Sequence, residues 1–287
     1  MKNVTPLHLA SALDRNYVVP YAVMLASLRR SIGHNKRAAA IVLHYDLLKD
    51  DLEFLNRVST QVQIPVTFTE IPRFPFALFK TRGRSSLASR TAMSPIAYAK
   101  AFLDRFVPSD IDQLICIDAD VVVVGDISGI KQFRDTDAPV AAVANIPRDH
   151  HHQFNSGFMV VDLAHWRDIG VSSISERFLL EHSESLHSHD QQTLNLIFKD
   201  RWEKIDLKWN YMEDYYRFKE RATAYSLEEI KTARESPIIV HYAVGTDKPW
   251  RAQCEHPRQD LYQSYREELL PLMNGLCLAD PQEPPRA

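Results

Sequence analysis

The amino-acid sequence predicts an α/β protein with a mixed, mostly parallel sheet that is flanked by helices. Strand-like and helix-like patterns alternate from the start of the chain to Ile71, which favours parallel strands joined by covering helices. A later apolar run, Gln113–Ile117, reads as a buried strand and ends at Asp118-Ala119-Asp120. The composition, with 45% hydrophobic and 25% charged residues, is that of an ordinary globular protein.

The first elements follow from hydrophobic spacing. Tyr21, Met24, Leu25 and Leu28 share one face of a predicted helix, and Gly33 is a stop signal. The predicted order is strand Thr5–Leu13, helix Tyr17–Ile32, strand Ala39–Tyr45, helix Lys49–Gln61 and strand Pro65–Ile71.

The later elements are read in the same way. Arg73–Ser89 is rich in Arg, Ser and Pro and is expected to form a surface loop, and Ser94-Pro95 is a usual helix start. The remaining predicted helices are Ser94–Phe106, Ala164–Glu181, His189–Lys199 and Pro257–Met273; the remaining strands are Gln113–Ile117, Val121–Val124, Ala138–Ala144, Gly157–Leu163 and Pro237–Ala243.

Length and charge limit the classes of function. A chain of 287 residues is one large domain or a domain with an appendage, and a formal net charge of −3 gives no basic field for nucleic acid. No stretch is apolar enough to span a bilayer, and the start of the chain is unlike a signal peptide. The three cysteines are odd in number and far apart, which fits a reducing cytosol.

Asp118 and Asp120 lie between the apolar runs Gln113–Ile117 and Val121–Val124. Desolvating two carboxylates there is costly unless a partner neutralises them. A divalent cation does this and also removes the repulsion between the carboxylates. Ligands of open α/β sheets bind at the carboxyl ends of strands. The motif therefore predicts a metal site, with an ordinary Asp-rich turn as the alternative.

Two more segments lie where strands are expected to end or begin. Asp14-Arg15-Asn16-Tyr17 follows the first strand and can hold a nucleotide, with Tyr17 stacking on a base and Asp14 or Asn16 at its edge. The alternative is a polar turn beside a core tyrosine. Phe154-Asn155-Ser156-Gly157 comes just before a predicted strand and can bring backbone close to a ligand, or it is a plain turn.

Later side chains can complete such a site. Asp190 and Gln191 open a predicted helix and can reach the hydroxyls of a sugar, although Asp190 can also serve only the helix dipole. His241 ends an apolar run and can be a third metal ligand or a core residue. Lys248, before Pro249-Trp250, suits a phosphate or is simply exposed.

Taken in this order, the segments resemble glycosyltransferase family 8, which includes bacterial lipopolysaccharide galactosyl- and glucosyltransferases and glycogenin. The resemblance covers roughly Leu7 to Trp250. Its pieces are Ala12–Tyr17, Ile117–Val121, Phe154–Gly157, Asp190-Gln191 with Asn195, and His241-Tyr242 with Lys248-Pro249-Trp250. It implies a GT-A fold, with residues 1–256 as the catalytic domain and 257–287 as a C-terminal helix and proline-rich tail.

The resemblance also implies a reaction. Members of the family transfer a hexose from a nucleotide sugar, usually a UDP-sugar, with Mn2+ and with retention of the anomeric configuration. UDP-galactose or UDP-glucose is the expected donor, and Mg2+ is the alternative metal. The expected acceptor is a glycan or glycolipid of lipopolysaccharide or surface polysaccharide biosynthesis.

Roles for individual residues come with the resemblance. It places the metal on Asp118, Asp120 and His241; the uridine on Asp14, Asn16 and Tyr17; the phosphates on Lys248 and the Gly245 backbone; and the donor on Asn155, Asp190, Lys100 and Ala119. Gln191 would lie beside the anomeric carbon, so Gln191, Asp190 and Lys248 form the expected catalytic set. An amide is a poor nucleophile, which favours same-face attack by the acceptor hydroxyl over a covalent glycosyl-enzyme.

Three departures concern the details. Lys100 stands where the family usually has Arg and lacks the bidentate fork. The segment Asn145–Phe154 is short, and the interval from His241 to Lys248 is one residue longer than usual. Asp149-His150-His151-His152 can bind a metal but reads first as a polar loop, since adjacent side chains point apart.

Two other functions remain open from the sequence. A glycogenin-like protein would glucosylate its own tyrosine, with Tyr211, Tyr215 or Tyr216 as acceptors. A non-catalytic nucleotide-sugar-binding protein is the second. The expected location is the cytoplasm. Peripheral association with the inner face of the cytoplasmic membrane stays open, because the C-terminal helix mixes aromatic and acidic residues and reads first as packed on the body.

Overall fold

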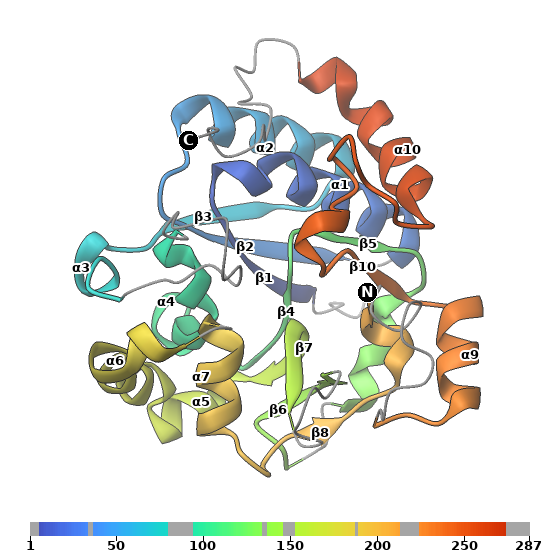
Figure 1. Cartoon of the computed structure of the whole chain (residues 1–287). Coiled ribbons are helices and arrows are strands. Elements are labelled where there is room, and N and C mark those ends of the chain that lie inside the picture. The colour runs from blue at the N-terminus through green and yellow to red at the C-terminus, as the bar shows by residue number, and fades with distance from the viewer. Residues whose placement is uncertain are drawn as a thin grey trace, which may run out of the picture.

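A seven-stranded mixed sheet forms the centre of the protein. The computed structural model describes residues 6–33, 37–79, 94–133, 137–145, 153–186, 189–212 and 224–273. The strand order is β3-β2-β1-β4-β7-β6-β8 (Figure 1). The strands are β1 (Leu7–Leu13), β2 (Ala38–His44), β3 (Val66–Glu70), β4 (Gln113–Ile117), β6 (Val140–Ala144), β7 (Phe154–Asp162) and β8 (Glu203–Lys204).

The pairing confirms a mixed, mostly parallel sheet. β3, β2, β1 and β4 run parallel to one another, and so do β6 and β8. β7 runs antiparallel to both β4 and β6. The amino end of β7 therefore lies beside the carboxyl end of β4, where the Asp118 backbone N–H donates to the Gly157 carbonyl at 2.9 Å.

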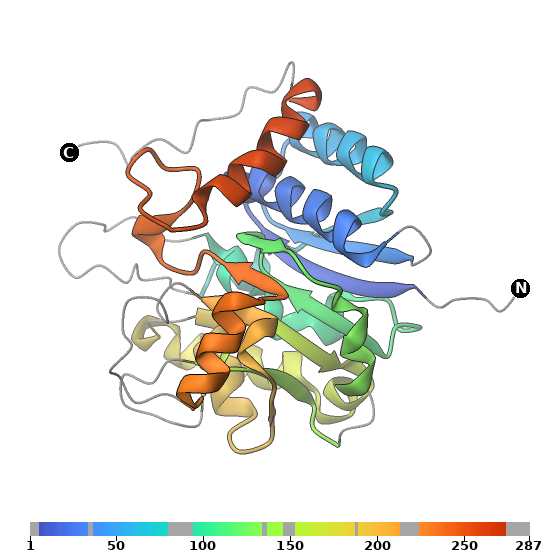
Figure 2. The ribbon, with the colours of Figure 1, turned by 90° about the vertical axis from the view of Figure 1, so that its right-hand side faces the viewer.

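Helices cover both faces of this sheet (Figures 1 and 2). On one face lie α1 (Val18–Ile32), α2 (Lys49–Val62) and α10 (Gln259–Leu269). The other face carries the 3-10 helix η2 (Pro95–Phe102), α4 (Leu103–Phe106), α5 (Leu163–Ile169), α6 (Val171–His182) and α7 (His189–Ile197). The two hydrophobic cores lie between the sheet and these layers.

A second, three-stranded sheet has the order β5-β10-β9 and lies beside the large one. Its strands are β5 (Val121–Val123), β10 (Ile239–His241) and β9 (Tyr211–Met212). The remaining elements are α3 (Arg73–Phe76), α9 (Leu227–Glu235) and the 3-10 turns η1 (Arg15–Tyr17), η3 (Ile127–Phe133), η4 (Ser183–Ser185), η5 (Leu207–Asn210), η6 (Gly245–Asp247) and η7 (Leu270–Leu272).

Four predicted elements differ from the structure. The helix Ala164–Glu181 is two helices, because Gly170 adopts φ +74° between α5 and α6. Ser94–Phe106 is the 3-10 helix η2 followed by the short α4.

The other two differences come from packing. The predicted loop Arg73–Ser89 begins with α3, because Phe76 and Phe79 pack against Phe102; residues 80–89 are outside the described part. Asn155 lies inside a strand and not in a turn before it, because β7 already begins at Phe154, which pairs with Ala144.

The C-terminal helix packs on the body, as its pattern predicted. Tyr262, Tyr265 and Leu269 are buried in the same core as α1, and Figure 2 shows α10 lying beside α1. Within the described ranges, none of the helices has the length and apolarity needed to cross a membrane.

Candidate metal centre

The sheet brings the predicted site residues to one edge. β1 and β4 are parallel neighbours, so Asp14 and Asp118 follow strands that end at the same edge. β5 continues from Asp120, and its antiparallel partner β10 places His241 opposite Val121. The Tyr242 backbone N–H donates to the Asp120 carbonyl at 3.0 Å, which fixes this register.

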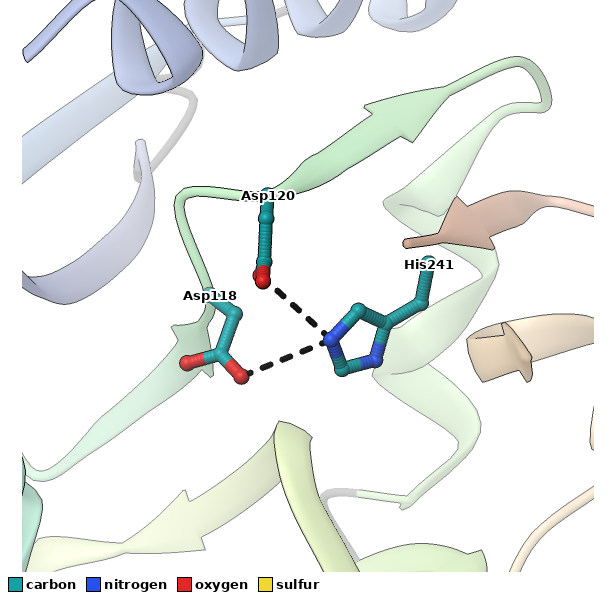
Figure 3. Close-up of side chains that lie close together, drawn as sticks. All are labelled: Asp118, Asp120 and His241. Atoms are coloured by element: carbon teal, nitrogen blue, oxygen red, sulfur yellow. Dashed lines mark ion pairs between the residues drawn. The ribbon is translucent and has the colours of Figure 1, made fainter. Parts of the chain in front are cut away.

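Asp118, Asp120 and His241 form a compact cluster, shown in Figure 3. Nε2 of His241 lies 3.6 Å from Oδ2 of Asp118 and 3.4 Å from Oδ1 of Asp120. One ligand atom from each residue lies within 4.8 Å of the others. Ligands of a single cation at about 2.0–2.6 Å from it are spaced in this way, and both carboxylates and imidazoles are common ligands of divalent metal ions. The residues therefore fit a divalent cation.

The amide of Asn210 holds the far side of the imidazole. Nδ1 of His241 lies 2.8 Å from Oδ1 of Asn210, whose Nδ2 donates to Oδ1 of Asn155 at 2.8 Å. Gly157 makes room for this arrangement, because a Cβ there would lie 2.3 Å from Cε1 of His241. Asn210 is a site residue that the sequence patterns did not predict. Its signal in the sequence was weak: an amide between the aromatic residues Trp209 and Tyr211.

Lys100 is buried beneath the cluster. Its ammonium lies 2.5 Å from Asp118 Oδ1 and 3.4 Å from Asp190 Oδ2, and it donates to the Ser156 carbonyl at 3.0 Å. Burial lowers the pKa of Lys100, but the two carboxylates outweigh it and raise the pKa above its usual range. The pKa of Asp190 is raised by burial despite Lys100. Three oxygens thus occupy the three protons of the ammonium.

Lys248 is the second buried cation. Its ammonium pairs with Asp120 and donates to the Tyr242 carbonyl at 2.6 Å. Burial favours the neutral acid, but Lys248 and His241 outweigh it and hold the pKa of Asp120 well below its usual range. Lys248 also faces the rings of Tyr17 and Trp250, which pack edge to face at 5.7 Å. The carboxylates are therefore neutralised by ammonium groups, and a divalent cation can take over that role.

A pocket opens beside this cluster, and most of the expected donor residues reach it. It is lined by Ala12, Asp14, Tyr17, Ser94, Ile96, Ala97, Lys100, Asp118, Ala119, Asp120, His189 and Asp190. Burial raises the pKa of Asp14, although its carboxylate accepts a hydrogen bond from the Asn16 backbone N–H at 2.9 Å. Asn16 and Gly245 are exposed and do not line the pocket.

Gln191 and Asn155 meet at the start of α7 and β7. Nδ2 of Asn155 donates to Oε1 of Gln191 at 3.1 Å, and the Ser156 N–H donates to the same oxygen at 3.3 Å. Asn195 fixes the two elements, since its amide exchanges hydrogen bonds with the Phe154 backbone at 2.8 and 2.9 Å. Gln191 therefore lies one residue from Asp190 with its amide oxygen held by two donors.

Some predicted residues lie elsewhere. Tyr211 is fully buried in β9, and its hydroxyl accepts a hydrogen bond from Arg234 at 3.3 Å, so it is not available as an acceptor in this structure. Tyr215, Tyr216 and Asp149-His150-His151-His152 are outside the described residues. The extra residue between His241 and Lys248 falls in a segment that includes the 3-10 turn η6.

The fold and the site together define an α/β protein with a carboxylate–histidine cluster that fits a divalent cation at the carboxyl edge of its sheet. The glycosyl transferase family 8 model matches residues 8–254. The chain therefore belongs to this family and is a hexosyltransferase.

Individual relatives are similar to this chain over most of its length. General stress protein A of Bacillus subtilis strain 168 is 27% identical over 273 residues, which span 90% of this chain and 92% of that protein. Lipopolysaccharide 1,2-glucosyltransferase of Escherichia coli K12 is 23% identical over 270 residues, spanning 89% of this chain and 76% of that protein.

Solved structures show the same fold. The galactosyltransferase LgtC, solved with donor and acceptor sugar analogs, has a TM-score of 0.74 at 19% identity over 91% of this chain and 96% of that one. A likeness at this identity establishes the GT-A fold that the sequence predicted.

Proposed function

We propose that the protein transfers a hexose from a UDP-sugar, UDP-galactose or UDP-glucose, to a glycan or glycolipid acceptor with retention of configuration. The single observation that carries this is the cluster of Asp118, Asp120 and His241 beside a pocket lined by Asp14 and Tyr17. The names of the E. coli glucosyltransferase and of LgtC support hexosyl donors and a lipopolysaccharide or surface-polysaccharide pathway.

Asp118, Asp120 and His241 would hold a Mn2+ or Mg2+ ion. Such an ion supplies Lewis-acid stabilisation of the negative charge on the leaving diphosphate. Lys248 adds a fixed positive charge, because its ammonium is buried next to Asp120 and is held by the Tyr242 carbonyl. The exposed Gly245 backbone, three residues before Lys248, is the other proposed phosphate contact.

The uridine is proposed to bind at Tyr17 and Asp14. Both line the pocket, and the Tyr17 ring is held edge to face by Trp250. Asn16 is proposed to contribute to the uridine site through its backbone. Its N–H donates to the Asp14 carboxylate and so orients that group. Ala119, Lys100 and Asp190 line the pocket where the donor sugar would follow, and Asn155 is hydrogen-bonded to Gln191, the residue after Asp190.

Gln191 is proposed to lie beside the anomeric carbon without attacking it. Both acceptor positions of its amide oxygen are used by Asn155 and Ser156, so no lone pair is free for a covalent bond. This favours same-face attack by the acceptor hydroxyl, whose proton passes to the departing phosphate. One LgtC structure is of an active-site mutant in which glutamine is replaced by glutamate, which supports an active-site role for such a residue.

The proposed location is the cytoplasm, with contact to the inner face of the membrane limited to peripheral association. Cys116 and Cys254 are free thiols in the described part of the chain, which agrees with a reducing compartment. The proposed catalytic domain is 1–256, followed by the helix and tail of 257–287.

The test is a panel of UDP-sugars incubated with the wild-type protein and with Asp120→Asn, with and without Mn2+. We expect UDP release from UDP-galactose or UDP-glucose only with metal, and a loss of at least about 100-fold in Asp120→Asn because its carboxylate no longer binds the ion. An exposed change, Asp168→Asn, is the control. Equal turnover by wild type and Asp120→Asn would contradict the metal assignment, and UDP binding without any turnover would favour a non-catalytic protein.

A further inference from the structure

The imidazole of His241 has two different nitrogens, and the amide groups around it indicate which one carries a proton. Nε2 faces the carboxylates of Asp118 and Asp120, whereas Nδ1 lies 2.8 Å from the Asn210 side chain. A neutral imidazole can donate from only one of these nitrogens, and only the other then has a lone pair for a metal. The orientation of the Asn210 amide therefore decides whether Nε2 can be a ligand.

Backbone N–H groups fix that orientation, because a backbone N–H can only donate. The Gly157 N–H donates to Asn155 at 2.9 Å, so the atom that it contacts is the Asn155 oxygen. The Ser156 N–H identifies the Gln191 oxygen in the same way at 3.3 Å. Nδ2 of Asn155 then donates to that Gln191 oxygen at 3.1 Å, which agrees with both assignments.

The position of the Asn155 oxygen also fixes the orientation of the Asn210 amide. The Asn155 oxygen lies 2.8 Å from the Asn210 amide, so the Asn210 atom that faces it must be the donor Nδ2. The Asn210 oxygen then faces Nδ1 of His241, which must carry the proton. Turning Asn210 over would set its oxygen against the Asn155 oxygen, which already accepts from the Gly157 N–H, and would lose the hydrogen bond to Asn155.

Burial makes this chain of amides rigid. Asn210 is fully buried, His241 is 3% exposed, and the absent Cβ of Gly157 leaves just the space that the imidazole fills. Asn210 ends η5 and immediately precedes β9, which pairs with β10, so the backbone holds Asn210 and His241 side by side.

We propose that Asn210 is a positioning residue of the metal site, which keeps His241 in its Nδ1–H tautomer and its Nε2 lone pair directed at the ion. The same series of hydrogen bonds continues through Asn155 to the Gln191 oxygen. The orientation of the Gln191 amide is therefore coupled to that of the His241 ring. This inference rests on the proposed role of His241 as a metal ligand. Second-shell partners of this kind typically change metal affinity by about 10–100-fold.

The experiment compares Asn210→Leu with Asn210→Asp in the full-length protein. Leu has a similar size but accepts no hydrogen bond. Asp keeps an acceptor for Nδ1–H at the same place, although it replaces the donor to Asn155 with a carboxylate oxygen and adds a buried negative charge. Two quantities are measured: the 15N chemical shifts of the His241 ring in the metal-free protein over a range of pH, and the dissociation constant for Mn2+ alone. The His241 signals are assigned by their absence from His241→Gln.

We expect Nδ1–H in the wild type and in Asn210→Asp, and a mixture of tautomers in Asn210→Leu together with about 10–100-fold weaker Mn2+ binding. A structural role alone would weaken both variants equally and leave the tautomer unchanged, and that result overturns the inference. A wild type with the proton on Nε2 also overturns it, even if neither variant folds. A wild type that binds no Mn2+ instead contradicts the proposed function.

Discussion

The carboxyl group of Asp14 is partly buried at the edge of the pocket, and this burial disfavours its negative charge in the free protein. It follows β1, caps η1 through the Asn16 N–H and lines the pocket. Burial raises its pKa, and the nearby Asp46 adds to this rise. The folded protein therefore holds a proton on Asp14 up to a higher pH than the unfolded chain does, so stability falls as pH rises between the two pKa values.

Replacing Asp14 with Asn should stabilise the free protein at neutral pH. The amide oxygen can still accept the Asn16 N–H, and the cost of a buried negative charge disappears. Thermal unfolding at pH 7 and below the unfolded pKa of about 3.9 measures this. We expect a higher midpoint for Asp14→Asn at pH 7 and no advantage in acid. A lower midpoint at both pH values would show that the carboxylate stabilises the fold.

Lys100 joins three elements that approach the site from different parts of the chain. It lies in η2, and it contacts Asp118 after β4, Asp190 in the first turn of α7 and the Ser156 carbonyl in β7. The carboxylates raise the pKa of Lys100, so the ammonium is charged throughout the accessible pH range. A cation in this position holds the elements together while no metal is bound.

Lys100→Met should destabilise the metal-free protein by about 3 kcal/mol, because removing one partner of a buried ion pair leaves uncompensated charge. Mn2+ should restore part of this loss by neutralising Asp118. The control is Lys49→Met, which removes a 3.6 Å pair with Glu53 on the surface and should change stability by less than about 0.5 kcal/mol. Denaturant unfolding with and without Mn2+ measures both. Equal effects for the two variants would contradict the role of Lys100.

The molecule as a whole closes its core with the C-terminal helix. α10 covers α1 with Tyr262, Tyr265 and Leu269, and Arg30 pairs with Glu268 at 2.9 Å. Tyr262 also packs on Tyr242 and Trp250, which flank Lys248 in the sequence. The end of the chain therefore supports the segment that carries the proposed phosphate ligand.

Deleting residues 257–287 should destabilise the remaining protein strongly, since the loss of each large buried aromatic side chain costs about 3–5 kcal/mol. We expect a lower unfolding midpoint and weaker UDP binding. Deletion of 274–287 alone keeps every described contact of α10 and provides the reference. If the 1–256 protein unfolds at the same midpoint as the reference, it is a complete domain without the helix.

Much of the fold could be predicted because it depends on local patterns. The alternation of apolar residues placed β1, β2, β4 and α1 to within one or two positions, and Gly33 ended α1 with φ +71°. The break at Gly170 was not predicted, because a glycine within a helical pattern can be helical or can adopt a positive φ, and the sequence does not distinguish the two. Asn155 was placed before its strand because the pairing of Phe154 with Ala144 is a contact between segments.

The sequence by itself identified the metal-binding candidates from their positions. Asp118 and Asp120 follow one apolar strand, and His241 ends another. The fold set how these groups act. The pairing of β5 with β10 brought His241 to the aspartates, burial placed Lys100 and Lys248 on them, and Asn210 came into contact with His241. Sequence patterns report which face of an element is buried, whereas the protonation and orientation of a buried group depend on partners that are distant in the chain.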